Sequence, residues 1–171
     1  MPSPIGHALG GVGIAWSAEL LTRRAVSTRV TIACAAAAVS ADIDLVLPMP
    51  HRTVTHSLTA VACVIVAAAV TGWVTGRRAH PMLFGAAYGS HLLLDWLAVD
   101  RSFPFGIQAL WPFSARWFYS GVDLFPATER QYFFTAASFA TNARAIGLEL
   151  LIFAPLMLAL WLFRRRSSCL G

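Results

Sequence analysis

Residues 57–75 read SLTAVACVIVAAAVTGWVT and contain no charged side chain. An α-helix rises about 1.5 Å per residue, so a run of this length nearly covers the roughly 30 Å hydrocarbon core of a bilayer. The stretch therefore predicts a membrane-spanning helix. It also indicates the fold class, which we expect to be an all-α helical membrane bundle.

The composition extends this prediction to the whole chain. The protein has 171 residues, of which 57% are hydrophobic and 12% charged, and its mean hydropathy is +0.64. Soluble domains carry about 25% charged residues. No internal repeat, low-complexity tract or flexible linker divides the sequence. We therefore expect one integral membrane domain over residues 1–171, and a soluble domain with a single anchor is excluded.

Five apolar runs are long enough to be read as membrane spans. They cover approximately residues 5–21, 30–47, 57–75, 81–99 and 145–163. The sequence thus predicts a polytopic bundle of about five spans.

Arginine clusters give these spans an orientation. The clusters are Arg23, Arg24 and Arg29 between the first two runs, Arg77 and Arg78 between the third and fourth, and Arg164, Arg165 and Arg166 after the fifth. Cytoplasmic connections are enriched in Lys and Arg, so we expect the N-terminus outside and the C-terminus inside. The net charge of +5 is then mainly an orientation signal. Attraction to lipid headgroups comes second, and nucleic acid is not an expected partner.

The segment 100–144 is rich in aromatic residues and is interrupted by Pro104, Pro112 and Pro126. Aromatic side chains with polar edges favour the headgroup layer of a membrane. We expect one or two short helices lying on the outer leaflet here. The segment could form only an aromatic belt or, alternatively, a lid or lipid-facing rim over a site.

Seven His and Asp side chains lie where the predicted topology brings residues to the outer face. They are His7, Asp42, Asp44, His51, His56, His91 and Asp95. Imidazoles and carboxylates are ligands of zinc and related divalent ions. Each residue alone has a structural alternative, such as a hydrogen-bonded interfacial His or a polar loop residue. Their convergence predicts a metal site at the membrane-water boundary.

Helix geometry supports three parts of this site. His91 and Asp95 are four residues apart, so they share one helical face, although a buried hydrogen-bonded pair is the alternative. Ser3-Pro4 predicts a helix start that puts His7 in the first turn. Asp42 and Asp44 are two residues apart and would lie on different faces of a helix, so the helix should loosen before Pro48 if both serve one site.

The connection from His51 to His56 adds two imidazoles and Arg52, whose planar guanidinium suits phosphate oxygens. A short polar loop is the alternative, as is an ion pair between Arg52 and one of the preceding carboxylates. Asp100, Asp123 and Glu129 lie on the same predicted face. They could add an outer ligand or a general base, or be solvated loop residues.

Five short motifs together resemble a known family. They are Pro4-Ile-Gly-His7, Ala41-Asp-Ile-Asp44, His51-Arg-Thr-Val-Thr-His56-Ser, Gly89-Ser-His91 to Asp95, and Leu110-Trp-Pro-Phe-Ser114. They resemble the LexA-binding, inner-membrane-associated hydrolases, also described as YdjM-like membrane-bound metal-dependent hydrolases. The resemblance covers most of the chain to about residue 120. It implies a bacterial inner membrane protein, and the family name implies a regulatory protein partner.

That family is remotely similar to zinc-dependent phospholipase C and single-strand nucleases, which hold their metals with scattered His and Asp residues. The pair His91 and Asp95 matches their His-x-x-x-Asp motif. By this analogy the other metal ligands are His7, an aspartate from Asp42 and Asp44, and His56. No His follows His91, so we expect one or two ions, zinc or alternatively manganese.

The function expected from these residues is hydrolysis by a metal-activated water. His7, Asp42, His56, His91 and Asp95 would hold the metal, and Asp44 and His51 would complete or orient the shell. Arg52 would stabilise charge that develops on the substrate. A phospholipid or lipid-linked phosphate at the outer boundary is the expected substrate.

Two other classes compete with the enzyme. A non-catalytic membrane protein would use the same residues as a structural metal site or polar network and act through protein partners. A small transporter would place ionisable residues near the bilayer midplane, whereas here they favour one mouth. An open coordination position would favour the enzyme, and a closed shell would favour a structural metal.

Overall fold

The computed structural model describes residues 1–48, 50–101, 103–129 and 135–168. Within these ranges the chain forms five α-helices, one 3-10 helix and no strand. They are α1 (Pro4–Thr22), α2 (Thr28–Val39), η1 (Ser40–Leu45, the 3-10 helix), α3 (Leu58–Thr75), α4 (Pro81–Leu97) and α5 (Ala136–Ser168). The predicted all-α class is confirmed, and a helix occurs in each of the five predicted regions.

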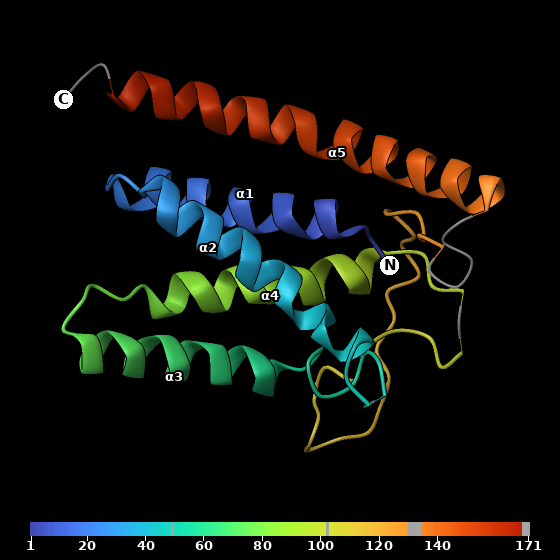
Figure 1. Cartoon of the computed structure of the whole chain (residues 1–171). Helices are drawn as coiled ribbons and strands as arrows, with labels where there is room; N and C mark the ends of the chain where they lie inside the picture. The colour runs from blue at the N-terminus through green and yellow to red at the C-terminus, as the bar shows by residue number, and fades with distance from the viewer. Residues whose placement is uncertain (49, 102, 130–134, 169–171) are drawn as a thin grey trace.

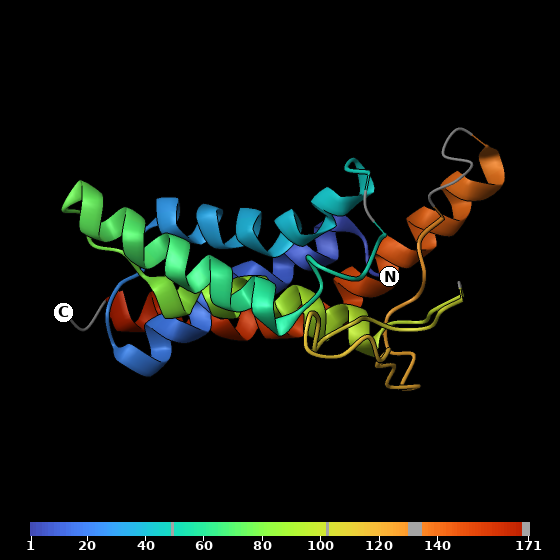
Figure 2. The same cartoon turned by 90° about the horizontal axis from the view of Figure 1, so that it is seen from below.

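The helices run along roughly one common direction (Figures 1 and 2). α1 and α4 form the centre, since α1 contacts α2, α4 and α5, whereas α3 contacts only α4 among the described helices. The N-terminus, η1 and the segment 98–129 gather at one end of the bundle, shown on the right in Figure 1. We call this the N-terminal end; the α1–α2 and α3–α4 connections lie at the other end.

The outer surface is strongly apolar. α3 has no buried residue, and its Trp73 and Val74 side chains are 84% and 71% exposed. Continuous apolar surface of this kind marks contact with lipid or with other chains. By length and composition, α3 and α5 could each cross a membrane. α2 and α4 have only 12 and 17 residues, and α1, with 19, does not meet the same criteria of length and composition. Two spans are therefore marked among the described residues, and the five-span arrangement stays a prediction.

Close helix packing depends on small residues at the crossings. A Cβ atom on Gly11 of α1 would lie 2.4 Å from the backbone oxygen of Cys34 and 2.9 Å from the Cα atom of Ala35, both in α2. Between α3 and α4, a Cβ atom on Gly85 would lie 2.3 Å from Ile65. The hydrophobic effect cannot hold helices together in lipid, so such close backbone approach becomes a main source of association.

The start of α1 is attached to α5. As predicted, Ser3 caps α1, and its Oγ accepts a hydrogen bond from the Gly6 amide. The fully buried Glu149 of α5 accepts a hydrogen bond of 2.7 Å from the Ser3 amide and a second from the Ser3 hydroxyl. Because a buried carboxylate needs donors, this contact holds the N-terminal turn against α5.

The prediction of short interfacial helices in the segment 100–144 was wrong for its described residues before α5. Residues 100–101 and 103–129 form no helix, and only two isolated bridges occur, between Ala98 and Phe125 and between Ile107 and Phe118. Proline removes a backbone donor and disfavours helix in the residue before it, so Pro104, Pro112 and Pro126 prevent a helical run. Residues 136–144 belong to α5, which begins earlier than expected. Residues 102 and 130–134 of this segment, including Arg130, lie outside the described residues.

We expect Gly11→Ala to lower the free energy of unfolding by about 1–3 kcal/mol, because the added methyl group meets the α2 backbone. Gly13→Ala is the matched control, since its Cβ would meet only the flexible end of Met157, at 3.1 Å. Thermal unfolding of both purified variants in one detergent would measure the difference. Equal melting temperatures would contradict the close α1–α2 crossing.

Candidate metal centre

Helix α1 brings His7 into the interior at the N-terminal end. The Ser3 cap and Pro4 start the helix, so His7 lies in its first turn, where the side chain is fully buried. Its Nε2 atom lies 3.4 Å from Oδ1 of Asp95, and its ring stacks on that of His91 with centroids 3.7 Å apart.

A change of helix type after α2 directs both aspartates toward the interior. The α-helix ends at Val39 and continues as the 3-10 helix η1, so the regular α-helix ends before Pro48 as expected, but by tightening rather than by loosening. A 3-10 helix has about three residues per turn and changes the directions of successive side chains relative to an α-helix. The Asp42 carboxylate lies 3.7 Å from His91 Nε2 and 3.8 Å from His56 Nε2.

His91 and Asp95 share the inner face of α4, as the four-residue spacing predicts, with 3.3 Å between His91 Nε2 and Asp95 Oδ2. The other ring nitrogen, Nδ1, lies 2.7 Å from the backbone oxygen of Ala38. Donation to that carbonyl requires the proton on Nδ1, so the lone pair of Nε2 points into the cluster.

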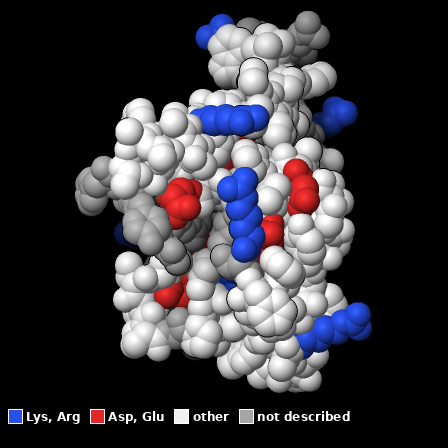
Figure 3. Space-filling view, turned by 90° about the vertical axis from the view of Figure 1, so that its right-hand side faces the viewer, with Lys and Arg blue, Asp and Glu red and all other residues white. Residues whose placement is uncertain are grey.

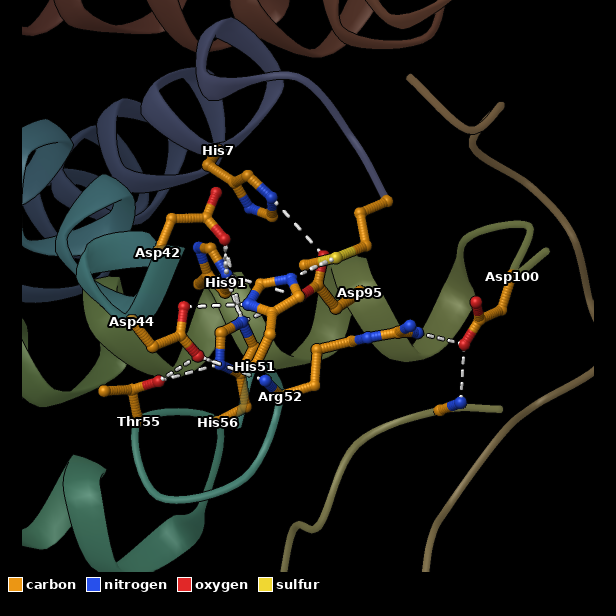
Figure 4. A network of polar contacts seen from close by, with 12 residues as sticks. His7, Asp42, Asp44, His51, Arg52, Thr55, His56, His91, Asp95 and Asp100 are labelled. Atoms are coloured by element: carbon orange, nitrogen blue, oxygen red, sulfur yellow. Dashed lines mark hydrogen bonds and ion pairs between the residues drawn. The ribbon is translucent and has the colours of Figure 1, made fainter. Parts of the chain in front are cut away.

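Three imidazoles converge on Asp95 (Figure 4). The Nε2 atoms of His7, His56 and His91 each lie 3.2–3.4 Å from its carboxylate, and the His56 and His91 Nε2 atoms are 3.0 Å apart. Two ligands bound at about 2.0–2.1 Å to a tetrahedral zinc ion are about 3.3 Å apart. The spacing of these atoms is therefore that of metal ligands.

Hydrogen bonding leaves part of this cluster unsatisfied. Among the described residues, neither ring nitrogen of His7 nor either carboxylate oxygen of Asp95 has a hydrogen-bond partner, although all four atoms are buried. An unsatisfied buried polar group costs about 1–3 kcal/mol, and more if it is charged. A bound cation would satisfy these atoms, so the donor set fits a divalent metal.

Three groups of residues bring ligand atoms within 4.8 Å of one another. They are His7, Asp42 and His91; Asp42, His51 and His56; and His56, His91 and Asp95. Together they contain every predicted metal ligand except Asp44.

Asp44 has other partners. Its Oδ1 lies 2.8 Å from His51 Nδ1, and its Oδ2 accepts hydrogen bonds from the Arg52 amide and the Thr55 hydroxyl, at 3.0 and 2.8 Å. His56 Nδ1 lies 3.2 Å from the same Oδ2. A carboxylate behind a ligating imidazole fixes its tautomer and orientation. In this geometry Asp44 positions His56 and His51.

The network also shifts the pKa of His56, which lies in the loop before α3. Burial of this side chain disfavours its protonated form. The carboxylates of Asp44 and Asp95 outweigh burial and raise the pKa of His56 to about 9.

Arg52 and His51 lie at the boundary between the cluster and a cavity of about 390 Å³. The cavity is lined by Met1, Leu45, His51, Arg52, Asp100, Arg101, Ala127, Thr128, Glu129 and Thr141. Figure 3 looks onto this end, where acidic and basic side chains lie close together. The Arg52 guanidinium binds the Asp100 carboxylate, and its backbone has a left-handed φ of 65°.

Asp100, Thr55 and Tyr88 are functional candidates whose roles the sequence did not indicate. Asp100 was expected to be an outer ligand, a base or a solvated residue, yet it binds Arg52 and accepts a hydrogen bond from the Gly106 amide. The Tyr88 hydroxyl donates to the Thr55 backbone oxygen, at 2.6 Å. For Thr55, its place in a short polar loop with two histidines was the sequence feature that could have indicated a role. No sequence feature indicated that Asp100 pairs with Arg52, which is 48 residues away.

An all-helical chain with two helices able to cross a bilayer, and a buried His and Asp cluster, defines a helical membrane protein with a candidate metal centre. The chain belongs to the YdjM inner membrane protein family, whose model matches residues 1–167. No curated protein and no solved structure matches it. The family description supports the predicted inner-membrane location.

In metal-free protein, we expect Asp44→Asn to lower the pKa of His56 below its raised value of about 9, because one of the two carboxylates that stabilise the imidazolium is lost. Titration of histidine-labelled, chelator-treated protein by NMR would measure it. Asp123→Asn, at an exposed site, should leave the titration unchanged. An unchanged pKa in Asp44→Asn would contradict the assigned role of Asp44.

Proposed function

We propose that this protein is a membrane-bound metal-dependent hydrolase that acts on phosphoesters. The observation that carries the proposal is the convergence of three imidazole Nε2 atoms on the buried Asp95 carboxylate, at 3.2–3.4 Å. The alternative is a structural polar network, and it predicts well-directed hydrogen bonds between these groups. Among the described residues, His7 and Asp95 approach one another at 3.4 Å without such a bond, which supports the proposal.

The proposed ligands are His7, Asp42, His56, His91 and Asp95. Nitrogen and oxygen ligands with no thiolate suit zinc, and manganese is the alternative. One ion would be held by members of the two ligand groups that share His91. A second ion would need His51 as an additional ligand, because the remaining described group contains Asp42, His51 and His56.

A bound divalent ion can lower the pKa of water from 15.7 to about 7 and polarise a phosphoryl oxygen. The residues of this chain would do the rest. Asp44 holds His56 and His51 in place through the contacts described above. Arg52 is kept at the cavity wall by Asp100, where its guanidinium would bind a phosphate group of the substrate.

The proposed substrate is a membrane phospholipid or a lipid-linked phosphate. The cavity beside His51 and Arg52 lies at the end of an apolar bundle, which suits an amphiphile with a phosphate headgroup. Similarity to zinc-dependent phospholipase C and single-strand nucleases, and binding of LexA or another regulatory protein, belong to this proposal as implications of the family resemblance. Nucleic acid is not proposed as a partner.

We further propose that residues 1–171 form one domain with five spans, an external N-terminus and a cytoplasmic C-terminus. Support comes from the end of the bundle opposite the site, where the α1–α2 and α3–α4 connections carry Arg23, Arg24, Arg77 and Arg78. Arg164 of α5 joins this end, since it pairs with Glu19 at 3.0 Å. Basic residues at one end favour the cytoplasm, which puts the metal centre at the outer boundary.

Cysteine labelling should find Arg116→Cys and Arg78→Cys on opposite sides of the membrane. Both positions are exposed, and they lie at opposite ends of the bundle. A membrane-impermeant maleimide applied to intact spheroplasts, in a background without the native cysteines, should label only Arg116→Cys. Labelling of both, or of Arg78→Cys alone, would contradict the orientation.

Metal content and hydrolysis should be lost together. Detergent-purified protein is expected to bind about one or two zinc or manganese ions, measured by plasma mass spectrometry, and to hydrolyse a phosphodiester, a phosphomonoester or a phospholipid in mixed micelles. Asp95→Asn, which preserves volume, and His91→Ala should lose metal and reduce hydrolysis more than about 100-fold, since removal of supporting groups alone costs 10–100-fold.

His80→Ala controls for loss of a histidine, because His80 lies in the α3–α4 connection at the opposite end. Circular dichroism would establish that each variant is folded. If folded wild type binds no metal after divalent ions are restored, the hydrolase proposal fails and the non-catalytic polar network is favoured. Metal without hydrolysis of any phosphoester would favour a structural site.

A further inference from the structure

A second cavity lies at the end of the bundle opposite the metal centre. It has a volume of about 760 Å³ and lies where α1 ends and α4 begins. Ligand sites in proteins commonly have volumes of about 300–1,000 Å³. None of the proposed metal ligands lines it, so it is separate from the site described above.

The walls of this cavity are mostly apolar, and Ser17 and Thr22 are the polar residues that α1 contributes. α1 contributes Ile14, Ala18 and Leu21, which are spaced by four and three residues and so share one helical face. α4 contributes Met82 and Leu83 from its first turn and Ala86 from its second. The distance from Ile14 to Leu21 is about 10 Å along the helix axis, because each residue rises about 1.5 Å.

The mouth of the cavity is basic. Arg24, Arg78 and His80 line it, and no acidic side chain is found among its described lining residues. Both guanidinium groups are exposed, and neither makes a hydrogen bond or an ion pair within the described part of the chain. Glu19, the nearby acid of α1, is instead paired with Arg164.

The start of α4 adds a favourable dipole. Its cap residue His80 makes no side-chain hydrogen bond to the first turn, so backbone amides beyond Pro81 are not capped by that side chain. The amino end of a helix attracts anions. Two arginines and a helix start therefore give one mouth that is complementary to a negative group.

We propose that an anionic phospholipid binds in this cavity, with its phosphate between Arg24 and Arg78 and one acyl chain along the groove between α1 and α4. A soluble anion would neutralise the arginines at the mouth but leave roughly 10 Å of apolar wall uncovered. An amphiphile would neutralise the arginines with its headgroup and cover the wall with its acyl chain. Basic cavities between membrane helices on the cytoplasmic side favour anionic headgroups. This binding site requires neither the metal nor hydrolysis.

The test compares two double variants of the full-length protein that remove the same charge from adjacent positions. Arg24→Gln with Arg78→Gln alters the mouth, whereas Arg23→Gln with Arg77→Gln alters arginines that do not line the cavity. Phosphatidylglycerol and phosphatidylcholine with identical acyl chains are titrated into the protein in detergent, and bound lipid is counted by native mass spectrometry. Thermal unfolding checks that each variant is folded.

We expect wild type to prefer phosphatidylglycerol and the mouth variant to lose about 10-fold or more in affinity, while the control changes by less than about 2-fold. Ala86→Phe, which fills an exposed part of the groove, should weaken binding although both arginines remain. Equal binding by the two double variants would overturn the proposal. So would inorganic phosphate that binds as tightly as the lipid, or unchanged lipid binding in folded Ala86→Phe.

Discussion

A carboxylate buried among helices in an apolar bundle is the constraint around which this protein is arranged. Asp95 of α4 is 5% exposed, and an ionised carboxylate removed from water costs several kcal/mol unless it is paired. The compensation comes from α1 through His7, from the loop before α3 through His56, and from α4 itself through His91. The three histidines must all approach the Asp95 carboxylate. Pairing of this one buried group therefore constrains how α1 and the loop before α3 pack against α4.

The His and Asp side chains at this end form two sets: an inner cluster around Asp95 and an outer network around Asp44 that positions two of the histidines. Asp95 and the three imidazoles form an inner cluster, whereas Asp44 uses both oxygens to bind His51, the Arg52 amide, Thr55 and His56. The outer network is joined by hydrogen bonds, whereas the Asp95 carboxylate meets the three imidazoles at ion-pair distances of 3.2–3.4 Å. The hydrogen bonds of Asp44 therefore fix the positions of His51 and His56 next to the inner cluster.

Local rules predicted the parts of this structure that local interactions determine. The uncharged run 57–75 indicated α3, Ser3-Pro4 indicated the start of α1, and the spacing of His91 and Asp95 indicated their common face. The α-helix of α2 does end before Pro48, but it tightens into the 3-10 helix η1 rather than loosening as expected. Two neighbouring carboxylates required an end to the regular α-helix if they were to face the same interior.

Long-range pairings and the aromatic segment could not be predicted in this way. The sequence did not show which of Asp42 and Asp44 would face the inner histidines. In the structure Asp42 lies near His91, whereas Asp44 binds the loop that contains Thr55. The guanidinium of Arg52 pairs with Asp100, 48 residues away, and only the backbone amide of Arg52 bonds to the nearby Asp44. In residues 103–129, aromatic composition suggested helices at an interface, but the prolines determine backbone conformation more directly than the side chains do.

The contact between Ser3 and Glu149 has a consequence for how the protein matures. Ser3 and Glu149 are separated by 146 positions, so the start of α1 is made early but gains its contact with α5 only after residue 149 has been synthesised. Every residue of the cluster around Asp95 precedes α5 in the chain. The last helix to be made therefore holds the start of the first.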